Sequence, residues 1–185
     1  MVAFASRAKW KAWLAKHHET SPGVWLEIAK KNAGIDSVTY AEALEVALCF
    51  GWIDGQKAAA DDSRWLQRFT PRSPRGSWSK INREKATAML ERGEMAPAGL
   101  REIEAARADG RWEAAYAGQR TMDVPDDLRD ALAANDRARA FFETVDRANR
   151  YAVLYRIAAA KKPETRRSRI EKLVAMLEEH RTLHP

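Results

Sequence analysis

Hydrophobic positions in the first fifty residues repeat with the spacing of a helix, then of a strand, then of a helix again. Residues 6–17 carry large apolar side chains at i, i+3 and i+4, which are neighbours on one face of an α-helix. Residues 24–28 form a short run of branched and aromatic side chains after a Pro-Gly pair, which predicts a strand. A second helix is expected from Thr39, because Thr39 and Glu42 have the spacing of a capping box, and it should stop at Gly51.

The spacing changes after this second helix, where two runs of strand character predict a β-hairpin. Its strands are residues 52–57 and 64–70, and the turn-forming cluster at 61–63 joins them. Asp54-Gly55 is a second candidate for the turn, which would shorten the first strand and shift the pairing register. Helical spacing then returns in two stretches, residues 80–92 and 97–109.

From Asp123 onward every local signal is helical, and this change predicts a boundary between two domains. We expect an α+β domain over residues 1–118, with a small antiparallel sheet and flanking helices, and a small all-α domain of three or four helices over residues 119–185. Pro125 is expected at the first position of its first helix, and Asp136 as the cap of the second. Two further helices follow, over residues 147–161 and 163–180.

The composition narrows the class of protein. Of the 185 residues, 45% are hydrophobic and 31% are charged, which excludes a fully disordered, collagen-like or disulfide-stapled chain. The chain has no run of about 18 apolar residues, and charges at Arg7 and Lys9 interrupt the apolar stretch that a secretory signal needs. We therefore expect a cytoplasmic protein that does not insert into a membrane. The single cysteine, Cys49, allows no internal disulfide and is predicted to be buried and unreactive.

Basic residues, which give a formal net charge of +6, are concentrated in two stretches. Residues 64–85 contain seven basic residues and one acidic residue, and residues 147–172 contain nine and two. Such clustering predicts attraction of anionic partners, including nucleic acids. The alternative interpretation is that both stretches form the solvated basic faces of an arginine-rich protein.

Basic and aromatic residues gather around the predicted hairpin and the helix that follows it. In a strand, Arg68 and Thr70 share one face, and Arg72 follows just beyond them. Arginine binds carboxylates and phosphates with paired hydrogen bonds, a helix that begins after Ser79 offers free N–H groups, and a tryptophan can stack on a planar group. The predicted anion site comprises Trp52, Asp54, Arg68, Thr70, Arg72, Trp78, Ser79 and Asn82.

Other interpretations of these residues stay open. In a structural interpretation, Asp54 pairs with Arg68 or Arg72 to hold the hairpin together, and the tryptophans fill the core. In an enzymatic one, Asp54 is an acid or base acting on a small anionic substrate. The chain contains no Gly-rich phosphate loop, nucleophile elbow or zinc-protease motif, so no cofactor is expected. No metal site is expected either, because the adjacent His17 and His18 point about 100° apart on a helix.

A second basic surface is predicted at the start of the last helix. Arg166, Arg167 and Arg169 lie there, where positive charge opposes the helix dipole. An anionic partner would compensate this charge. Alternatively, the arginines are solvated or pair with the acidic residues at 126–130.

Several motifs follow one another along the chain. Those of the first half are Phe50-Gly51-Trp52-Ile53-Asp54-Gly55, Arg68-Phe69-Thr70-Pro71-Arg72, and Trp78-Ser79-Lys80 with Asn82. Those of the second half are Val124-Pro125 with Leu128 and the segment 160–170. Taken in order, these motifs resemble the bacteriocin-protection, YdeI/OmpD-associated family, and those of the second half resemble its small C-terminal helical domain. The resemblance implies a bacterial protein linked with tolerance of envelope-acting peptides and with association to an outer-membrane porin, and it implies no catalytic residue.

From these observations we expect a non-enzymatic module for stress and bacteriocin protection, which binds a protein partner or a small anion at the predicted anion site. One alternative is a nucleic-acid-associated protein that uses residues 64–85 and 147–172, and it predicts a steep salt dependence of binding. The enzymatic alternative predicts a turnover that the substitution Asp54→Asn removes.

Overall fold

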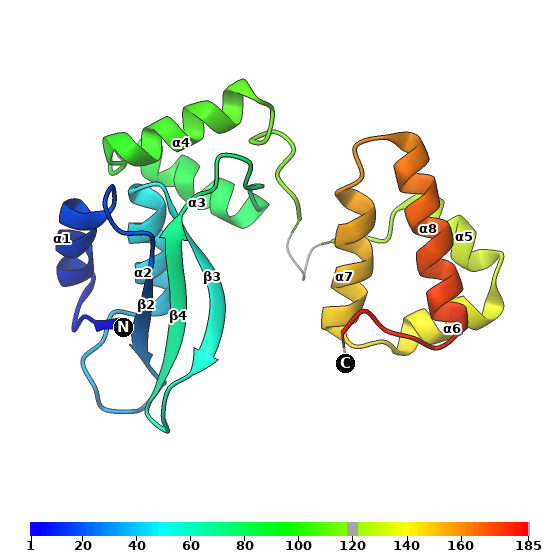
Figure 1. Ribbon diagram of the computed structural model, residues 1–185, viewed down its shortest axis with the longest axis horizontal. Helices are drawn as coiled ribbons and strands as arrows, with labels where there is room; N and C mark the ends of the chain where they lie inside the picture. The colour runs from blue at the N-terminus through cyan, green and yellow to red at the C-terminus, as the bar shows by residue number, and fades with distance from the viewer. Residues whose placement is uncertain (118–121, 185) are drawn as a thin grey trace. The chain divides into compact units, whose positions relative to one another are not determined.

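The computed structural model describes residues 1–117 and 122–184. Contacts divide the chain into two compact units, Met1–Ala115 (unit 1) and Tyr116–Pro185 (unit 2) (Figure 1). Unit 1 combines a sheet with helices, and the elements of the described part of unit 2 are helices, so the predicted α+β fold class is confirmed. The predicted boundary between residues 118 and 119 lies outside the described residues.

Local signals explain where the helices of unit 1 begin. Ser6 caps the first helix, and Thr39 forms the predicted capping box with Glu42. Ser79 caps the third. The helices are α1 (Arg7–His17), α2 (Tyr40–Cys49), α3 (Lys80–Glu91) and α4 (Pro97–Ala108). The strands are β1 (Val2–Ala3), β2 (Val24–Ala29), β3 (Trp52–Ala59) and β4 (Arg64–Pro71).

The strands form one sheet in the order β1-β2-β4-β3. β4 pairs antiparallel with both β2 and β3, whereas β1 runs parallel to β2. Two residues are too few to show a strand period, so spacing did not reveal β1. The alternative turn at Asp54-Gly55 is wrong, because β3 continues through it to Ala59. A register shift between Asp54 and Lys57 marks an irregularity in the ladder at this point.

Helices α1 and α2 lie on one side of the sheet (Figure 1), and the core of unit 1 combines their buried side chains with those of the sheet, α3 and α4. Side chains alternate along β4, so Gln67 and Phe69 are fully buried on this side while Arg68 and Thr70 are half-buried on the other. We call the other side the open sheet face. By strand register it carries Trp25, Ile53, Leu66, Arg68 and Thr70.

Four helices form the described part of unit 2, around a core of their own. Pro125 caps the first helix instead of starting it, and Asn135 rather than Asp136 caps the second. The Asn135 carboxamide takes this role because it accepts a hydrogen bond from the Ala138 N–H at 3.0 Å. The helices are α5 (Asp126–Ala133), α6 (Asp136–Thr144), α7 (Arg147–Ala158) and α8 (Pro163–Glu178). The core includes Leu128, Phe142, Ile157 and Leu173.

Candidate functional site

The sheet separates residues that were predicted to form one anion site. Arg68 and Thr70 lie on the open sheet face, as the alternation along β4 predicts. Asp54 is the ladder partner of the buried Phe69 and therefore points to the helix-covered side. There its carboxylate accepts a hydrogen bond from the Tyr40 hydroxyl at 2.7 Å, and burial together with this carboxylate raises the pKa of Tyr40. The predicted ion pair between Asp54 and Arg68 does not form, because the sheet lies between them.

Arg72 and Trp78 form a buried pair. Arg72 is 6% exposed and Trp78 is 1% exposed. The guanidinium carbon of Arg72 lies 3.8 Å from the Trp78 ring centroid, and its Nη2 donates a hydrogen bond to the Ser77 carbonyl at 2.8 Å. Trp78 also packs edge-on against Trp112, with the ring centroids 4.8 Å apart. Trp78 therefore lies in the core, as the structural interpretation predicts for the tryptophans, and the Arg72 guanidinium stacked on it holds the loop after β4 in place.

A small cavity of about 130 Å³ borders the same arginine, and Trp52 contributes to its lining. Trp52 is 1% exposed, and its indole N–H donates to the His18 carbonyl at 3.1 Å. Glu19 and Glu102 line the cavity as well. Arg101 lines it too and pairs with Glu19 at 3.3 Å, so the cationic side chains of this cavity are matched by carboxylates and an anionic ligand is not favoured there.

Ser79 and Asn82 stabilise the start of α3. The Ser79 hydroxyl accepts a hydrogen bond from the backbone N–H of Asn82 at 3.2 Å, as the predicted cap requires. One of the backbone N–H groups that could bind an anion at this helix end is therefore already hydrogen-bonded to the Ser79 hydroxyl.

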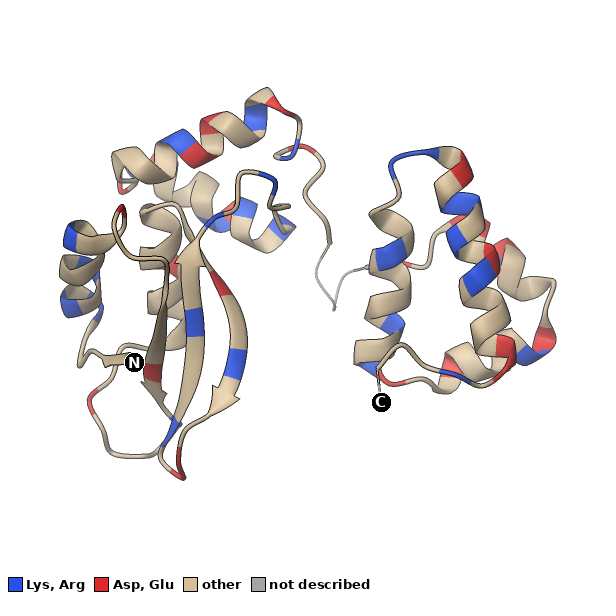
Figure 2. Ribbon diagram, in the orientation of Figure 1, with Lys and Arg blue, Asp and Glu red and all other residues tan. Residues whose placement is uncertain are grey.

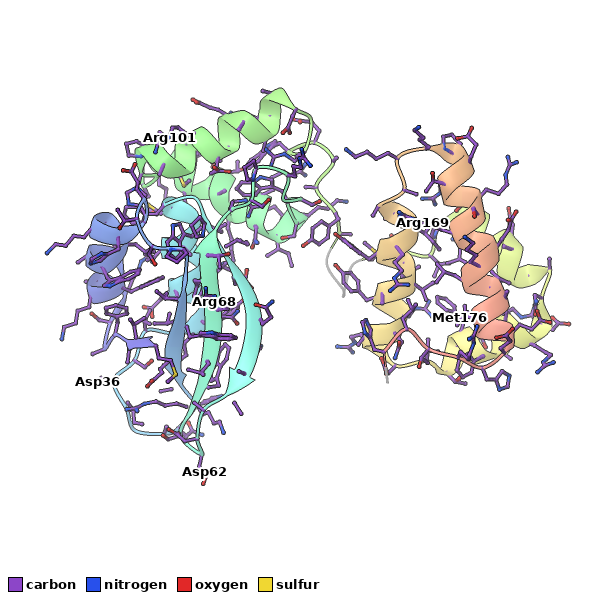
Figure 3. The ribbon with its side chains drawn as sticks, in the orientation of Figure 1. Asp36, Asp62, Arg68, Arg101, Arg169 and Met176 are labelled. Atoms are coloured by element: carbon purple, nitrogen blue, oxygen red, sulfur yellow. The ribbon has the colours of Figure 1, made fainter. Side chains whose placement is uncertain are left out.

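Arg68 lies across the open sheet face, where Figure 3 labels it near the middle of the sheet. Its guanidinium carbon is 5.8 Å from the ring centroid of Trp25, its ladder partner on β2. Gly23 makes room for this arrangement with a φ of 129°. A Cβ at Gly23 would lie 3.0 Å from Arg68 Nη2 and 2.7 Å from Thr70 Cγ2. Sequence spacing did not identify Gly23 and Trp25 as neighbours of Arg68, because the pairing of β2 with β4 brings them together.

The charge of Arg68 is not compensated by an ion pair within the described residues. On the same face, Glu27 pairs with Arg64 at 3.5 Å. Two other cations of the stretch 64–85 are bound by unit 1 itself: Arg83 donates to a backbone carbonyl at 3.1 Å, and Lys85 lies 3.5 Å from a glutamate. This stretch is therefore not one continuous basic surface.

The predicted second basic surface divides in a similar way. Arg166 binds both carboxylate oxygens of Asp127, at 2.5 and 2.8 Å, and holds the pKa of that carboxyl below its ordinary value. Arg167 is exposed, and Arg169 donates a hydrogen bond to the backbone carbonyl of Arg156 on α7. Figure 2 shows the basic residues of α8 interspersed with acidic ones. Arg166 therefore joins α5 to α8. Arg167 and Arg169 form no ion pair with a carboxylate among the described residues.

His17, His18 and Cys49 make packing or backbone contacts within unit 1. In the part of the chain that the structure describes, no group of three or more His, Cys, Asp or Glu side chains is placed to hold a metal ion. The His17 ring packs on Trp13, and Nδ1 of His18 lies 2.9 Å from the Leu14 carbonyl oxygen. Cys49 is 4% exposed, and burial raises the pKa of its thiol. Of the described helices, none has the length and apolarity needed to span a membrane.

Comparison with known protein families gives a match in each unit. Residues 2–102 match the family model described as Domain of unknown function (DUF8412), which covers more than half of the chain. The chain belongs to the DUF8412 family. Residues 121–180 match the family model described as Bacteriocin-protection, YdeI or OmpD-Associated (OmdA). No match was found among the curated proteins or among the solved structures.

The OmdA match confirms the resemblance predicted from the C-terminal motifs. The motifs between residues 50 and 82, which were predicted to belong to the same family, lie in the segment that matches DUF8412. The chain therefore joins a DUF8412 region, whose description names no function, to an OmdA region whose description refers to bacteriocin protection.

Proposed function

We propose that this protein is a non-enzymatic binding module of bacterial stress defence, which contributes to protection against bacteriocins by binding an acidic segment of a partner protein on its open sheet face. The OmdA match of residues 121–180 supports the general role. The observation that carries the binding proposal is the position of Arg68, which lies on the open sheet face beside Trp25 and has no carboxylate partner among the described residues.

The open sheet face has the residue types of a protein interface. Arginine and tryptophan are enriched at the energetic centres of interfaces, and here Arg68 and Trp25 are neighbours. The half-buried Leu66 adds apolar area on the same face. The uncompensated charge of Arg68 favours an acidic partner over a basic one. A small anion is the alternative ligand of this face.

The test is affinity capture from a nuclease-treated bacterial lysate with the full chain as bait. The variant Arg68→Glu is compared with the wild type and with Arg75→Glu, which makes the same change of charge at an exposed position of the loop after β4. Proteins that bind wild type and Arg75→Glu, but not Arg68→Glu, are identified by mass spectrometry. The direct interaction is then measured with the purified partner before and after its acidic segment is neutralised.

The proposal is supported if the affinity for the partner falls when Arg68 is changed to Glu, and also when the acidic segment of the partner is neutralised. In a strain without the native gene, survival of the bacteria on exposure to a bacteriocin should then be restored by Arg75→Glu and not by Arg68→Glu. Equal capture by the two variants would overturn the assignment to this face. A thermal shift with inorganic phosphate or citrate that requires Arg68, without any captured protein, would identify a small anion instead.

A further inference from the structure

Unit 2 contains a groove between α7, α8 and the segment that follows α8. Its cavity volume is about 640 Å³, which is within the range of small-molecule sites in proteins. Figure 3 labels Arg169 and Met176, which lie on the side of α8 that lines the groove. We call it the α7–α8 groove. Its lining includes Arg156, Arg169, Lys172, Arg181, Met176 and Leu183.

The groove combines an apolar floor with a cationic rim. Along α8, Arg169, Lys172 and Met176 follow at i, i+3 and i+7, which places them on one stripe of the helix. Met176 and Leu183 are partly buried against the core of unit 2 and form apolar floor. Arg156 on α7 faces the same cavity. One ligand in the groove would therefore meet apolar and cationic groups at the same time.

The rim keeps most of its charge. Within residues 1–117 and 122–184, no carboxylate lies at ion-pair distance from Arg156, Arg169 or Lys172. Arg169 donates to a backbone carbonyl, which is neutral and leaves the guanidinium charge uncompensated. Arg181 pairs with Glu179 at 2.8 Å, in a largely exposed contact that solvent screens. Like charges around an apolar cavity repel each other, so an anion bound among them is favoured.

The wall of the groove that follows α8 is held in place by a buried polar residue. Asn149 on α7 is 4% exposed, and its Oδ1 accepts hydrogen bonds from the N–H groups of Leu183 at 3.0 Å and His184 at 2.9 Å. Its Nδ2 donates to Asp146 at 3.1 Å. These bonds position the backbone of Leu183 before any ligand binds, which lowers the ordering cost of binding.

We propose that the α7–α8 groove binds an amphipathic organic anion, with its carboxylate or phosphate head among Arg156, Arg169 and Lys172 and its apolar body against Met176 and Leu183. The site lies in unit 2, uses none of the residues of the open sheet face, and is independent of the proposed function. A free fatty acid and an anionic membrane lipid both have an anionic head and an apolar body. Vesicle binding distinguishes these two sources.

The probe is decanoate below its micelle concentration, titrated into the full chain by calorimetry. Acetate, which has the head without the body, and 1-decanol, which has the body without the head, are the matched ligand controls. Decanoate should bind at one site, and each control should bind at least about tenfold more weakly, because each satisfies only half of the groove. The resonance of the Met176 methyl group should shift with decanoate. Equal affinity for decanoate and either control would overturn the proposal.

Two pairs of variants test the groove itself. Lys172→Glu should weaken decanoate binding by at least about tenfold, while Arg167→Glu, the same change of charge at an exposed position of α8 outside the groove, should stay within about twofold of the wild type. Ala159→Trp fills the cavity without removing charge and should abolish binding. Ala158→Trp, at the exposed neighbouring position, is its control. Equal losses within either pair would mean that the groove is not the site.

Vesicles identify the source of the anion. The ligand comes from an anionic lipid if the wild type binds phosphatidylglycerol vesicles but not phosphatidylcholine vesicles, and if decanoate releases it from them. Decanoate binding without vesicle binding identifies a free anion. A folded wild type that binds neither decanoate nor phosphatidylglycerol would overturn the proposal.

Discussion

Two arginine–tryptophan pairs that involve the β4 segment differ in what surrounds them. Arg72 is buried, with its guanidinium 3.8 Å from the Trp78 ring, whereas Arg68 lies half-buried on the open sheet face, 5.8 Å from Trp25. The first pair is part of the packing of unit 1, and the second keeps its charge available to a partner. Residues of one type, four positions apart in one basic stretch, therefore have different roles.

Helix α8 repeats this contrast in unit 2. Arg166 is bound by Asp127, while Lys172, less than two turns further along, has no ion-pair partner among the described residues and faces the α7–α8 groove. In both basic stretches, some of the charge stabilises the fold and the rest faces solvent. A count of basic residues does not separate these two uses.

The largest expected effect is on stability, when Arg72 and Arg68 are each truncated to alanine. Arg72→Ala should lower the free energy of unfolding of unit 1 by about 2–4 kcal/mol, because it removes the stacked cation, leaves the Ser77 carbonyl without this donor and opens a cavity. Arg68→Ala should change it by no more than about 0.5 kcal/mol. All seven tryptophans lie in unit 1, so denaturant unfolding followed by tryptophan fluorescence reports on this unit. Similar losses for the two variants would refute the difference in roles.

An intermediate effect is expected at Gly23, which makes the arrangement of Arg68 and Thr70 on the open sheet face possible. Gly23→Ala should destabilise unit 1 by about 1–3 kcal/mol, since a Cβ there would lie 2.7 Å from the Phe69 carbonyl oxygen and φ is 129°. The control is Gly34→Ala, where φ is 67° and nothing lies within 4 Å of a Cβ, so only about 1 kcal/mol of backbone strain is expected. Fluorescence-detected unfolding of both variants is the measurement. A smaller loss at Gly23 than at Gly34 would contradict the close approach.

The smallest expected effect is a pH-dependent change of stability at the ion pair between Asp127 and Arg166. The pKa of Asp127 is lowered in the folded state by Arg166, so its stabilising contribution is complete above the unfolded-state pKa of about 4 and is lost as the pH falls through the folded-state pKa. Asp127→Asn should cost less than about 1 kcal/mol at pH 7, because solvent screens this half-exposed pair. The variant should also lose less stability than the wild type on acidification.

Hydrogen exchange of unit 2 amides, measured at pH 7 and pH 3 by mass spectrometry with correction for the intrinsic exchange rate, tests this expectation. The neighbouring variant Asp126→Asn is the control, since Asp126 is largely exposed and pairs within its own helix with Arg129. The same change of acid dependence in both variants would show that the bond between α5 and α8 has no special weight.

Most elements of the fold were accessible from local patterns. The capping box at Thr39 and Glu42 predicted the start of α2, and the apolar spacing of residues 6–17 predicted the helix that forms there as α1. The hairpin was predicted with its strands one or two residues short. The two-residue β1 escaped detection, because its conformation depends on a neighbouring strand and not on a period of its own.

The candidate site was less accessible. Spacing along β4 correctly placed Arg68 and Thr70 on one face, but it did not indicate that Arg72 turns inward or that Asp54 binds Tyr40 on the helix-covered side. The α7–α8 groove was also missed. The sequence places Arg169, Lys172 and Met176 on one stripe of α8. This stripe does not predict a groove, because the groove also needs α7 and the segment after α8 as its other walls.

Residue spacing and caps were sufficient to predict the α+β fold class and most of its helices and strands, because helix and strand periods are local properties of the backbone. Which cations stabilise the fold and which face solvent could be seen only in the tertiary structure. Burial and ion pairing depend on contacts between segments far apart in the chain, such as Trp25 with Arg68, Asp127 with Arg166, and Asn149 with Leu183. The free energy of a charge is set by those contacts and by its access to water, and neither is a property of its position in the sequence.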